Sequence, residues 1–354
     1  MRTTIKARFN PPEVFPLTKQ TTTAYVPTTV ADLSKLPKIK GFDFSASKGS
    51  AALKDLKKFI ASYATTGMQA SKLAAAIEVV KTMRSEQATI FLTYTSNMVS
   101  SGLRDIIRFL VQEKLVQALV TTAGGIEEDF MKCLGDFSLG DFNVNGAYLN
   151  EHGINRIGNV FVTNDFYALF ETHMHAILDH CYAKQQERGR PLCTSEIIKE
   201  MGRSMDEQKL PNREQSIIYW AYKNDIPLFT PAFTDGSLCD MVFFHRQQKG
   251  DFFVDISQDM DAIVKLALNA EKSGVLALGG GSSKHYALNA QIFRDGCEFA
   301  VYINSHSEED GSDSGAGTSE AVSWTKIKPN APQVKVWGDA TILFPLLVAG
   351  AFVE

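Results

Sequence analysis

The alternation of apolar and polar segments along the chain predicts a parallel α/β sheet. From residue 89 onward, short apolar runs alternate with stretches of helical periodicity. The runs are TIFLTYT, LVQALVTTA, GNVFVTN, IPLFTPA, GVLALGGG and EFAVYIN, and a helical pattern follows each of the first five. Short strands that alternate with helices are typical of a parallel sheet with helices on both faces.

The two ends of the chain have different patterns. Residues 1–30 are rich in Pro and Thr and lack periodicity, so we expect an extended or helical N-terminal arm there. Residues 52–67 and 69–86 have helical spacing and predict an N-terminal helical extension of the sheet. The C-terminal run TILFPLLVAGAFV predicts a buried helix or a strand followed by a helix, because it is too short to span a bilayer and contains Pro345. No linker divides residues 31–354, which we expect to form a single α/β domain.

Composition and charge narrow the class of protein. The chain has 354 residues and a net charge of −4, so no basic surface favours nucleic acid or an anionic membrane as a partner. Its five cysteines are scattered without a CxxC pair, which favours reduced thiols in a cytoplasmic protein over a disulfide framework or a zinc site. The N-terminus has no apolar segment typical of a secretory signal.

Five polar turns follow the predicted strands and indicate a ligand site. They read TSNMVSSG, TTAGGIEED, FTDGSLCD, LGGGSSKH and INSHSEEDGSDSG. Ligands of open parallel sheets bind beyond the carboxyl ends of the strands, where these turns meet. Helix N-caps alone favour the same residue types, but five such turns together favour a crevice for a polar ligand.

Individual motifs leave alternatives open. The sequence GGGSSK could hold an anionic group at a helix N-terminus or serve close helix–strand packing; it is not a Walker A motif. Glu127 and Glu128 are adjacent, so they point in different directions and at most one serves a given ligand group. His173, His175 and His180 lack the four-residue spacing of a zinc protease, and we expect no bound metal.

The segment EAVSWTK, with the loop before it, suggests a site for a cationic amine. The indole of Trp324 could stack on an alkylammonium group, and Asp313 and Glu320 could hold ammonium ends. With no serine elbow and no cysteine in a cationic setting, lysines are the candidates for covalent chemistry, above all Lys326 and Lys284. Nearby carboxylates raise the pKa of a lysine whereas burial lowers it, and the sequence leaves this balance open for Lys326.

These segments, in this order, resemble the deoxyhypusine synthase family. The stretches that carry the resemblance run from about residue 89 to the end of the chain: TSNMVSSGLRD, TTAGGIEEDF, PLFTPAFTDGSLCDMVFFH, LGGGSSKH, AVYIN, EDGSDSGA and EAVSWTKI. The resemblance implies a Rossmann-like α/β domain that uses NAD and spermidine. It also implies a homotetramer, a dimer of dimers, with active sites at the interface inside each tight dimer.

The resemblance also assigns residues to roles. It implies that Lys326 carries the covalent intermediate and that His285 accepts a proton. The residues that match NAD contacts are Ser96, Asn97, Ser100, Thr122, Ala123, Gly124, Glu128, Asp235, Ser305, His306, Asp339 and Ala340. Those that match the polyamine pocket are Glu127, Asp240, His285, Gly311, Asp313, Glu320 and Trp324.

The implied reaction transfers a 4-aminobutyl group to one lysine of a translation factor precursor. NAD oxidises spermidine, Lys326 attacks the imine and displaces diaminopropane, the acceptor lysine takes the fragment, and the retained NADH reduces the product. Two positions depart from the family pattern: Thr325 stands where many members have glycine, and His306 stands where a small residue is common.

Three other interpretations compete with this one. Homospermidine synthase passes the same fragment to putrescine and has nearly the same motifs. A regulatory paralogue would lack the lysine, whereas Lys326, Glu320 and Trp324 are all present. A sirtuin-like deacylase would carry a four-cysteine zinc module, which the scattered cysteines do not form.

Overall fold

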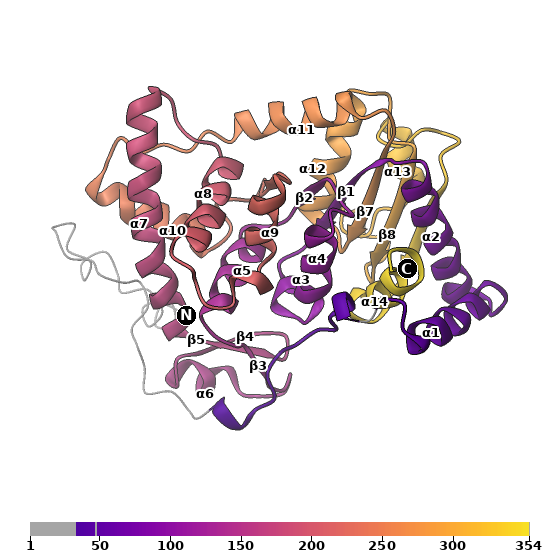
Figure 1. Ribbon diagram of the computed structural model, residues 1–354, viewed down its shortest axis with the longest axis horizontal. Coiled ribbons are helices and arrows are strands. Elements are labelled where there is room, and N and C mark those ends of the chain that lie inside the picture. The colour runs from indigo at the N-terminus through magenta and orange to yellow at the C-terminus, as the bar shows by residue number, and fades with distance from the viewer. Residues whose placement is uncertain (1–32, 47, 354) are drawn as a thin grey trace.

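A six-stranded parallel sheet forms the centre of the molecule (Figure 1). The computed structural model describes residues 33–46 and 48–353. The strands of this sheet, in spatial order, are β6 (Leu228–Phe229), β2 (Ala118–Val120), β1 (Thr89–Tyr94), β7 (Ser273–Leu278), β8 (Phe299–Asn304) and β9 (Gln333–Trp337). Every neighbouring pair is parallel, as the alternating pattern of the sequence predicts.

The strand order is that of the Rossmann fold. The chain starts at β1, continues outward to β2 and β6, and then returns to the other side of β1 to form β7, β8 and β9. The order therefore reverses between β1 and β7. In open sheets of this kind, the crevice outside the carboxyl ends of the strands at such a reversal is where ligands bind.

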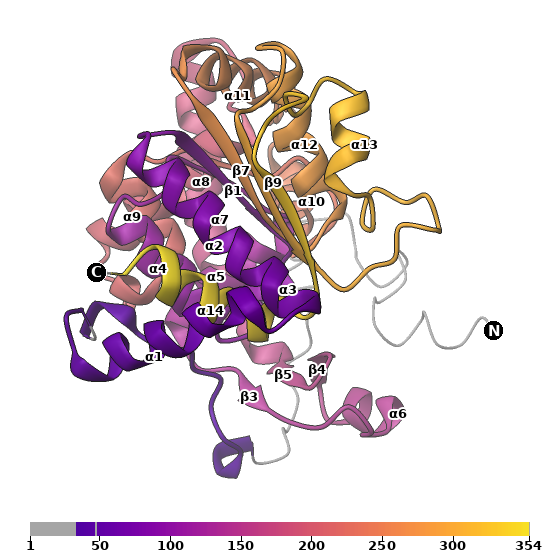
Figure 2. The ribbon, with the colours of Figure 1, turned by 90° about the vertical axis from the view of Figure 1, so that its right-hand side faces the viewer.

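The described residues form fourteen α-helices, most of which pack around the central sheet on its two faces, whereas α6 lies beside β4 (Ile154–Ile157) of a separate small sheet. They are α1 (Ala51–Ala61), α2 (Met68–Ser85), α3 (Asn97–Ser100), α4 (Leu103–Gln112), α5 (Ala123–Leu134), α6 (Gly146–Glu151), α7 (Asn164–Arg188), α8 (Thr194–Glu207), α9 (Ile217–Asn224), α10 (Ser237–Gln248), α11 (Ser257–Asn269), α12 (Gly281–Ile292), α13 (Thr318–Ser323) and α14 (Ala340–Ala351). Short 3₁₀ turns lie at Leu33–Lys35, Phe44–Ala46, Ser62–Thr65 and Arg213–Gln215. In Figure 2 the sheet separates α12 and α13 from α2, α4 and α14.

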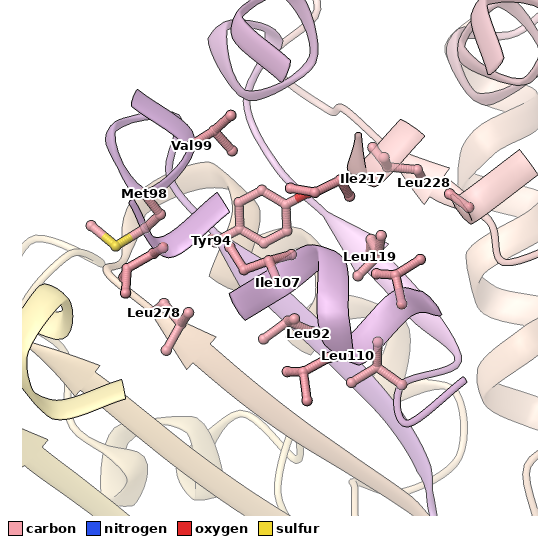
Figure 3. Close-up of a cluster of buried hydrophobic side chains, with 14 of the residues drawn as sticks. Leu92, Tyr94, Met98, Val99, Ile107, Leu110, Leu119, Ile217, Leu228 and Leu278 are labelled. Atoms are coloured by element: carbon pink, nitrogen blue, oxygen red, sulfur yellow. The ribbon is translucent and has the colours of Figure 1, made fainter. Parts of the chain in front are cut away.

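The two faces of the sheet form two separate apolar cores. Successive side chains of β1 point to opposite faces, so Leu92 and Tyr94 enter the larger core while Phe91 enters the smaller one. Figure 3 shows the larger core, where Leu92 and Tyr94 lie among side chains of α3, α4 and β2. Strands β7 and β8 are buried along their whole length, which explains why they read as continuous apolar runs.

One predicted strand lies outside the central sheet. The run GNVFVTN forms β5 (Val160–Thr163), which pairs antiparallel with β3 (Ser138–Leu139) and β4 (Ile154–Ile157) in a separate three-stranded sheet. Both ribbon views place this small sheet away from the main one (Figures 1 and 2). The expectation that this run joins the parallel sheet is wrong, because an apolar run reports burial but not its pairing partner. Strand β9, in contrast, is a strand that the apolar pattern did not predict.

The helical predictions for both ends of the described chain are confirmed. Helices α1 and α2 precede the first strand and form the N-terminal helical extension, and α14 takes up the C-terminal apolar run with Pro345 inside it. The predicted arm over residues 1–30 lies outside the described residues. Within the part of the chain that the structure describes, no helix is both long and apolar enough to cross a membrane.

A buried aspartate links three of these helices. Asp129 of α5 is fully buried and accepts a hydrogen bond of 2.7 Å from Nε of Arg104 in α4. Its carboxylate also accepts hydrogen bonds from the hydroxyl of Ser216 and from the backbone N–H groups of Ile217 and Ile218, at 2.6, 3.1 and 2.9 Å. The Asp129 carboxylate thereby supplies hydrogen-bond acceptors both to the free N–H groups in the first turn of α9 and to the Arg104 guanidinium.

Replacing Asp129 with alanine removes the carboxylate that accepts hydrogen bonds from this buried guanidinium and from the first turn of α9. We expect Asp129→Ala to lower the free energy of unfolding by about 3–5 kcal/mol, measured by urea denaturation. The control is Asp55→Ala, which removes an exposed carboxylate 3.3 Å from Lys58 and should change the free energy of unfolding by less than about 0.5 kcal/mol. If Asp129→Ala lowers the free energy of unfolding by less than about 1 kcal/mol, the hydrogen bonds of Asp129 contribute little to stability.

Candidate active site

A cavity opens at the carboxyl edge of the sheet, where the strand order reverses. Its volume is about 480 Å³, and its wall includes Thr95 after β1 and the Gly279–Ser282 turn after β7. Six of the residues predicted to bind the cofactor line it: Asn97, Thr122, Ser305, His306, Asp339 and Ala340. The parallel topology therefore brings together side chains from the turns after β1, β2, β8 and β9.

The glycine turn between β7 and α12 depends on close backbone contact. A Cβ on Gly280 would come within 2.5 Å of the backbone of Ser314, and Gly279 has a φ of +81°, which favours glycine. The turn therefore packs directly against the loop that follows β8. Both alternatives for GGGSSK remain compatible with this geometry, since the same turn serves close packing and opens the N-terminus of α12 toward the cavity.

The adjacent acids of α5 point in different directions, as expected. Glu127 accepts a hydrogen bond of 2.7 Å from the backbone N–H of Leu238 in α10. Glu128 accepts one from the hydroxyl of Ser100 in α3. Burial raises the pKa of Glu127 to about 7 and that of Glu128 to about 8, so both carboxyls hold their protons more tightly than exposed ones.

The other residues predicted to bind the cofactor lie outside the cavity wall, as far as the described residues define it. The backbone N–H of Ser96 donates to Oγ1 of Thr122 at 3.1 Å, and a Cβ on Gly124 would approach Cβ of Ser96 to 2.8 Å. Ala123 is fully buried at the start of α5. Asp235 is exposed in the turn before α10, and its charge contributes to the raised pKa of Glu127.

Asp339, besides lining the cavity, caps α14 by accepting a hydrogen bond of 2.8 Å from the N–H of Thr341.

Lys326 occupies a position fixed by the end of α13. The N–H of Thr325 donates to the carbonyl of Val322 at 3.0 Å, and the N–H of Lys326 donates to that of Ala321 at 2.9 Å. This pair of bonds is a Schellman motif, and Thr325 takes its left-handed position with a φ of +60°. The carbonyl of Lys326 in turn accepts a hydrogen bond of 3.1 Å from the N–H of Cys297, so the backbone is held on both sides.

The Lys326 amine faces an imidazole and an indole. Its Nζ lies 3.2 Å from Nε2 of His285 in α12 and 5.8 Å from the centroid of the Trp324 ring. Lys326 is only 7% exposed, whereas Trp324 is 63% exposed. Burial lowers the pKa of Lys326, and the charges of Asp313 and Glu320 oppose this without reversing it. The balance that the sequence left open thus favours a more readily deprotonated amine.

Lys284, the other candidate for covalent chemistry, has a structural position. It is 1% exposed, and its Nζ donates to the backbone carbonyls of Asp313 and, at 3.4 Å, of Ala316. It also lies 3.7 Å from Oδ2 of Asp313 and over the ring of Tyr302. Lys284 therefore holds the loop after β8, and Lys326 is the better candidate for the nucleophile.

The residues predicted for the polyamine pocket lie in four places, the first of which is His285 in α12. Gly311 and Asp313 belong to the loop after β8, where Gly311 has a φ of +71°. Glu320 and Trp324 lie at the start and end of α13. Asp240 lies in the first turn of α10, and Glu127 of α5 contacts that turn. Burial raises the pKa of Asp240, and the charge of Asp240 contributes to the raised pKa of Glu127.

Lys326 and the cavity form two neighbouring parts of the site. Among the described residues, neither Lys326 nor His285 belongs to the cavity wall. Two segments connect the parts: α12, which contributes Gly281 and Ser282 to the wall and His285 one turn later, and the loop after β8, which contributes Ser314 next to Asp313.

Sequence reasoning missed several residues around these two parts. Asn289 places Nδ2 3.0 Å from Nδ1 of His285, and its four-residue spacing from His285 on a predicted helix could have indicated this. Asn304 and Ser314 line the cavity, and both lie in or beside motifs already recognised. Lys132, four residues after Glu128, contacts the segment that carries Ser96 and Ser100.

The described residues contain no group of three or more His, Cys, Asp or Glu side chains arranged to hold a metal ion. The absence of a metal stays a prediction.

The strand order and the cavity at its reversal define a Rossmann-like α/β protein with a polar ligand site at the carboxyl edge of the sheet. The family model for deoxyhypusine synthase matches residues 58–351. The chain therefore belongs to the deoxyhypusine synthase family, an enzyme family of transferases that acts in hypusine biosynthesis.

Relatives from distant organisms agree with this assignment. A protein of Thermococcus gammatolerans named "Probable deoxyhypusine synthase" is 48% identical over 300 residues, covering 83% of this chain and 89% of the relative. A protein of Dictyostelium discoideum with the same name is 43% identical over 343 residues, covering 91% and 88%. A solved structure from Entamoeba histolytica with the same family name has a TM-score of 0.57 at 28% identity and covers 89% of this chain and 96% of its own.

The left-handed backbone of Thr325 gives a test of the helix end that positions Lys326. A β-branched residue at this φ carries a steric cost that glycine avoids, so we expect Thr325→Gly to raise the free energy of unfolding by about 0.5–1 kcal/mol. The control is Thr325→Ala, which keeps a Cβ and should raise the free energy of unfolding by less than Thr325→Gly does. Thermal and urea unfolding measure both, and a clear destabilisation by glycine would contradict the proposed strain.

The lowered pKa of Lys326 predicts how the reactivity of its amine depends on pH. Competitive labelling with acetic anhydride, followed by peptide mass analysis, should give Lys326 a half-reaction pH below the ordinary lysine value of 10.5. Because the charge of Asp313 raises this pKa, Asp313→Asn should shift the half-reaction pH further down. An upward shift in the variant would mean that Asp313 does not act on the amine.

Proposed function

We propose that this enzyme transfers the 4-aminobutyl group of spermidine to one lysine of a translation factor precursor, with NAD as cofactor and Lys326 as the covalent carrier. The observation that carries this proposal is the Lys326 amine, nearly buried and 3.2 Å from Nε2 of His285. An amine with a lowered pKa beside a proton acceptor has the properties that a nucleophilic lysine needs. Family membership supplies the reaction class.

The cavity at the strand reversal has features that suit a dinucleotide. It lies where such cofactors bind in sheets of this order, and the N-terminus of α12 opens into it beside the glycine turn. Nδ2 of Asn304, in the cavity wall, is buried without a hydrogen-bond partner among the described residues, which leaves a donor for a ligand. Asn97, Thr122, Ser305, His306 and Asp339 would hold NAD, which when bound accepts a hydride from the amine substrate and returns it to the product.

The acidic and aromatic residues suit a polyamine. Trp324 offers an exposed ring face for an alkylammonium group, and Asp313 and Glu320 supply negative charge near Lys326. Burial raises the pKa values of Glu127 and Asp240, and an ammonium group bound beside them would stabilise their carboxylate forms and lower both pKa values again.

In this proposal Lys326 is the nucleophile and His285 is the proton acceptor. The neutral Lys326 amine attacks the imine carbon of oxidised spermidine, and diaminopropane leaves as the new imine forms on Nζ. His285 Nε2 lies where it can take the proton that this attack releases. The acceptor lysine then attacks the Lys326 imine and releases Lys326, so the fragment moves without net loss of atoms.

We also propose that a second copy of the chain completes the site. His285 and Trp324 are exposed beside the nearly buried amine, and among the described residues neither Lys326 nor His285 belongs to the cavity wall. A homotetramer built as a dimer of dimers would cover these side chains and exclude water from the imine. The five free cysteines support a reducing compartment, the cytoplasm, for this assembly.

Lys326→Arg tests the covalent role. We expect the variant to bind NAD and spermidine as the wild type does, but to lose product formation by about three orders of magnitude or more, because a guanidinium does not form the imine. Intact mass and peptide mapping after incubation with NAD, spermidine and borohydride should show the fragment on Lys326 of the wild type and none in the variant.

The control is Lys328→Arg, two residues further along, where the lysine amine lies 2.5 Å from Glu298. It should keep the intermediate and the activity. Normal turnover by Lys326→Arg would remove Lys326 from its role. In the same assay, product on putrescine but not on the precursor protein would reassign the acceptor.

A further inference from the structure

One face of α5 contacts the segment between β1 and α4 at three successive turns. Gly124, Glu128 and Lys132 are four residues apart and therefore share this face. Gly124 lies against Ser96, and Glu128 accepts the hydrogen bond of Ser100. Lys132 is the third member of this stripe, and the function described above gives it no role.

The Lys132 amine binds three backbone carbonyls at once. Its Nζ donates to the carbonyl of Val99 at 2.6 Å, to that of Ser100 at 2.7 Å and to that of Ser101 at 3.1 Å. An ammonium group has three N–H donors, so these three bonds use all of them. The side chain is buried and also lies over the ring of Phe137, 5.1 Å from its centroid.

The segment that Lys132 binds, at the end of α3, depends on contacts from outside the segment for its conformation. Helix α3 spans only Asn97–Ser100, too short to be stable by itself, and a cation at its end interacts favourably with the helix dipole. The residues of the same segment face the cavity: Thr95 and Asn97 belong to its wall. A movement of the carbonyls at positions 99–101 would therefore move the groups that face the ligand.

We propose that Lys132 is a positioning residue for the dinucleotide site: by clamping the end of α3, it sets the orientation of Thr95–Ser100 toward the cofactor. This inference rests on the proposed function, because it takes NAD as the occupant of the cavity. Lys132 acts through Asn97 and Ser96 and does not itself belong to the cavity wall among the described residues.

The test measures NAD binding separately from turnover. Lys132→Met keeps the length of the buried chain but removes its donors, and Lys132→Gln restores some of them. We expect the Kd for NAD, measured by calorimetry on the full-length protein, to rise tenfold to a hundredfold in Lys132→Met and by less in Lys132→Gln. In steady state, the KM for NAD should rise while kcat at saturating NAD stays within about threefold of the wild type, since Lys132 touches no reacting atom.

A matched control separates this role from a general loss of stability. Lys265→Met removes an exposed lysine that pairs with Asp261 on α11 and should leave the Kd unchanged. The proposal would be overturned by a Lys132 variant whose melting temperature falls while its Kd for NAD stays within twofold of the wild type. Failure of both Lys132 variants to fold would overturn it as well. Either result would assign Lys132 to the stability of the fold alone. If the wild-type protein itself does not bind NAD, the proposed cofactor is wrong, which is a different outcome.

Discussion

Burial of the parallel sheet on both faces decides where this protein can do chemistry. Strands β7 and β8 have no exposed residue, so the flanks of the sheet are occupied by two apolar cores. Polar groups then concentrate at the carboxyl edge, where the turns leave the strands and the order reverses between β1 and β7. The apolar sheet determines the place of the site, and the turns determine its chemistry.

Buried charged groups next to this edge hold the turns that line the cavity. Asp129 ties α4, α5 and α9 together, Lys132 holds the end of α3, and Lys284 holds the loop after β8. Each of these charges is buried and has its hydrogen bonds directed at specific partners, which is the condition under which a buried charge is tolerated. Because removal of one partner would leave the other buried and uncompensated, these contacts favour one position for each turn.

The position of Lys326 illustrates how local geometry and burial combine. A Schellman motif fixes the backbone of Lys326 at the end of α13, and Thr325 accepts a left-handed conformation to make it. The same placement buries most of the side chain and brings Nζ to His285, which comes from another element 41 residues earlier in the chain. Burial then lowers the pKa of the amine despite two nearby carboxylates, so position and reactivity have one cause.

The sequence by itself determined the fold class, five of the six central strands, the two N-terminal helices and the polar turns that form the carboxyl edge. These features depend on local periodicity and turn chemistry, which each segment carries within itself. The tertiary structure alone decided that the run GNVFVTN, which forms β5, pairs in a separate sheet and that the segment at Gln333–Trp337 is a strand. It also decided that Lys284 is a loop clamp while Lys326 faces His285, and that burial prevails over the carboxylates in setting the pKa of Lys326. Strand pairing and desolvation depend on segments far apart along the chain, and a local pattern of residues contains no measure of either.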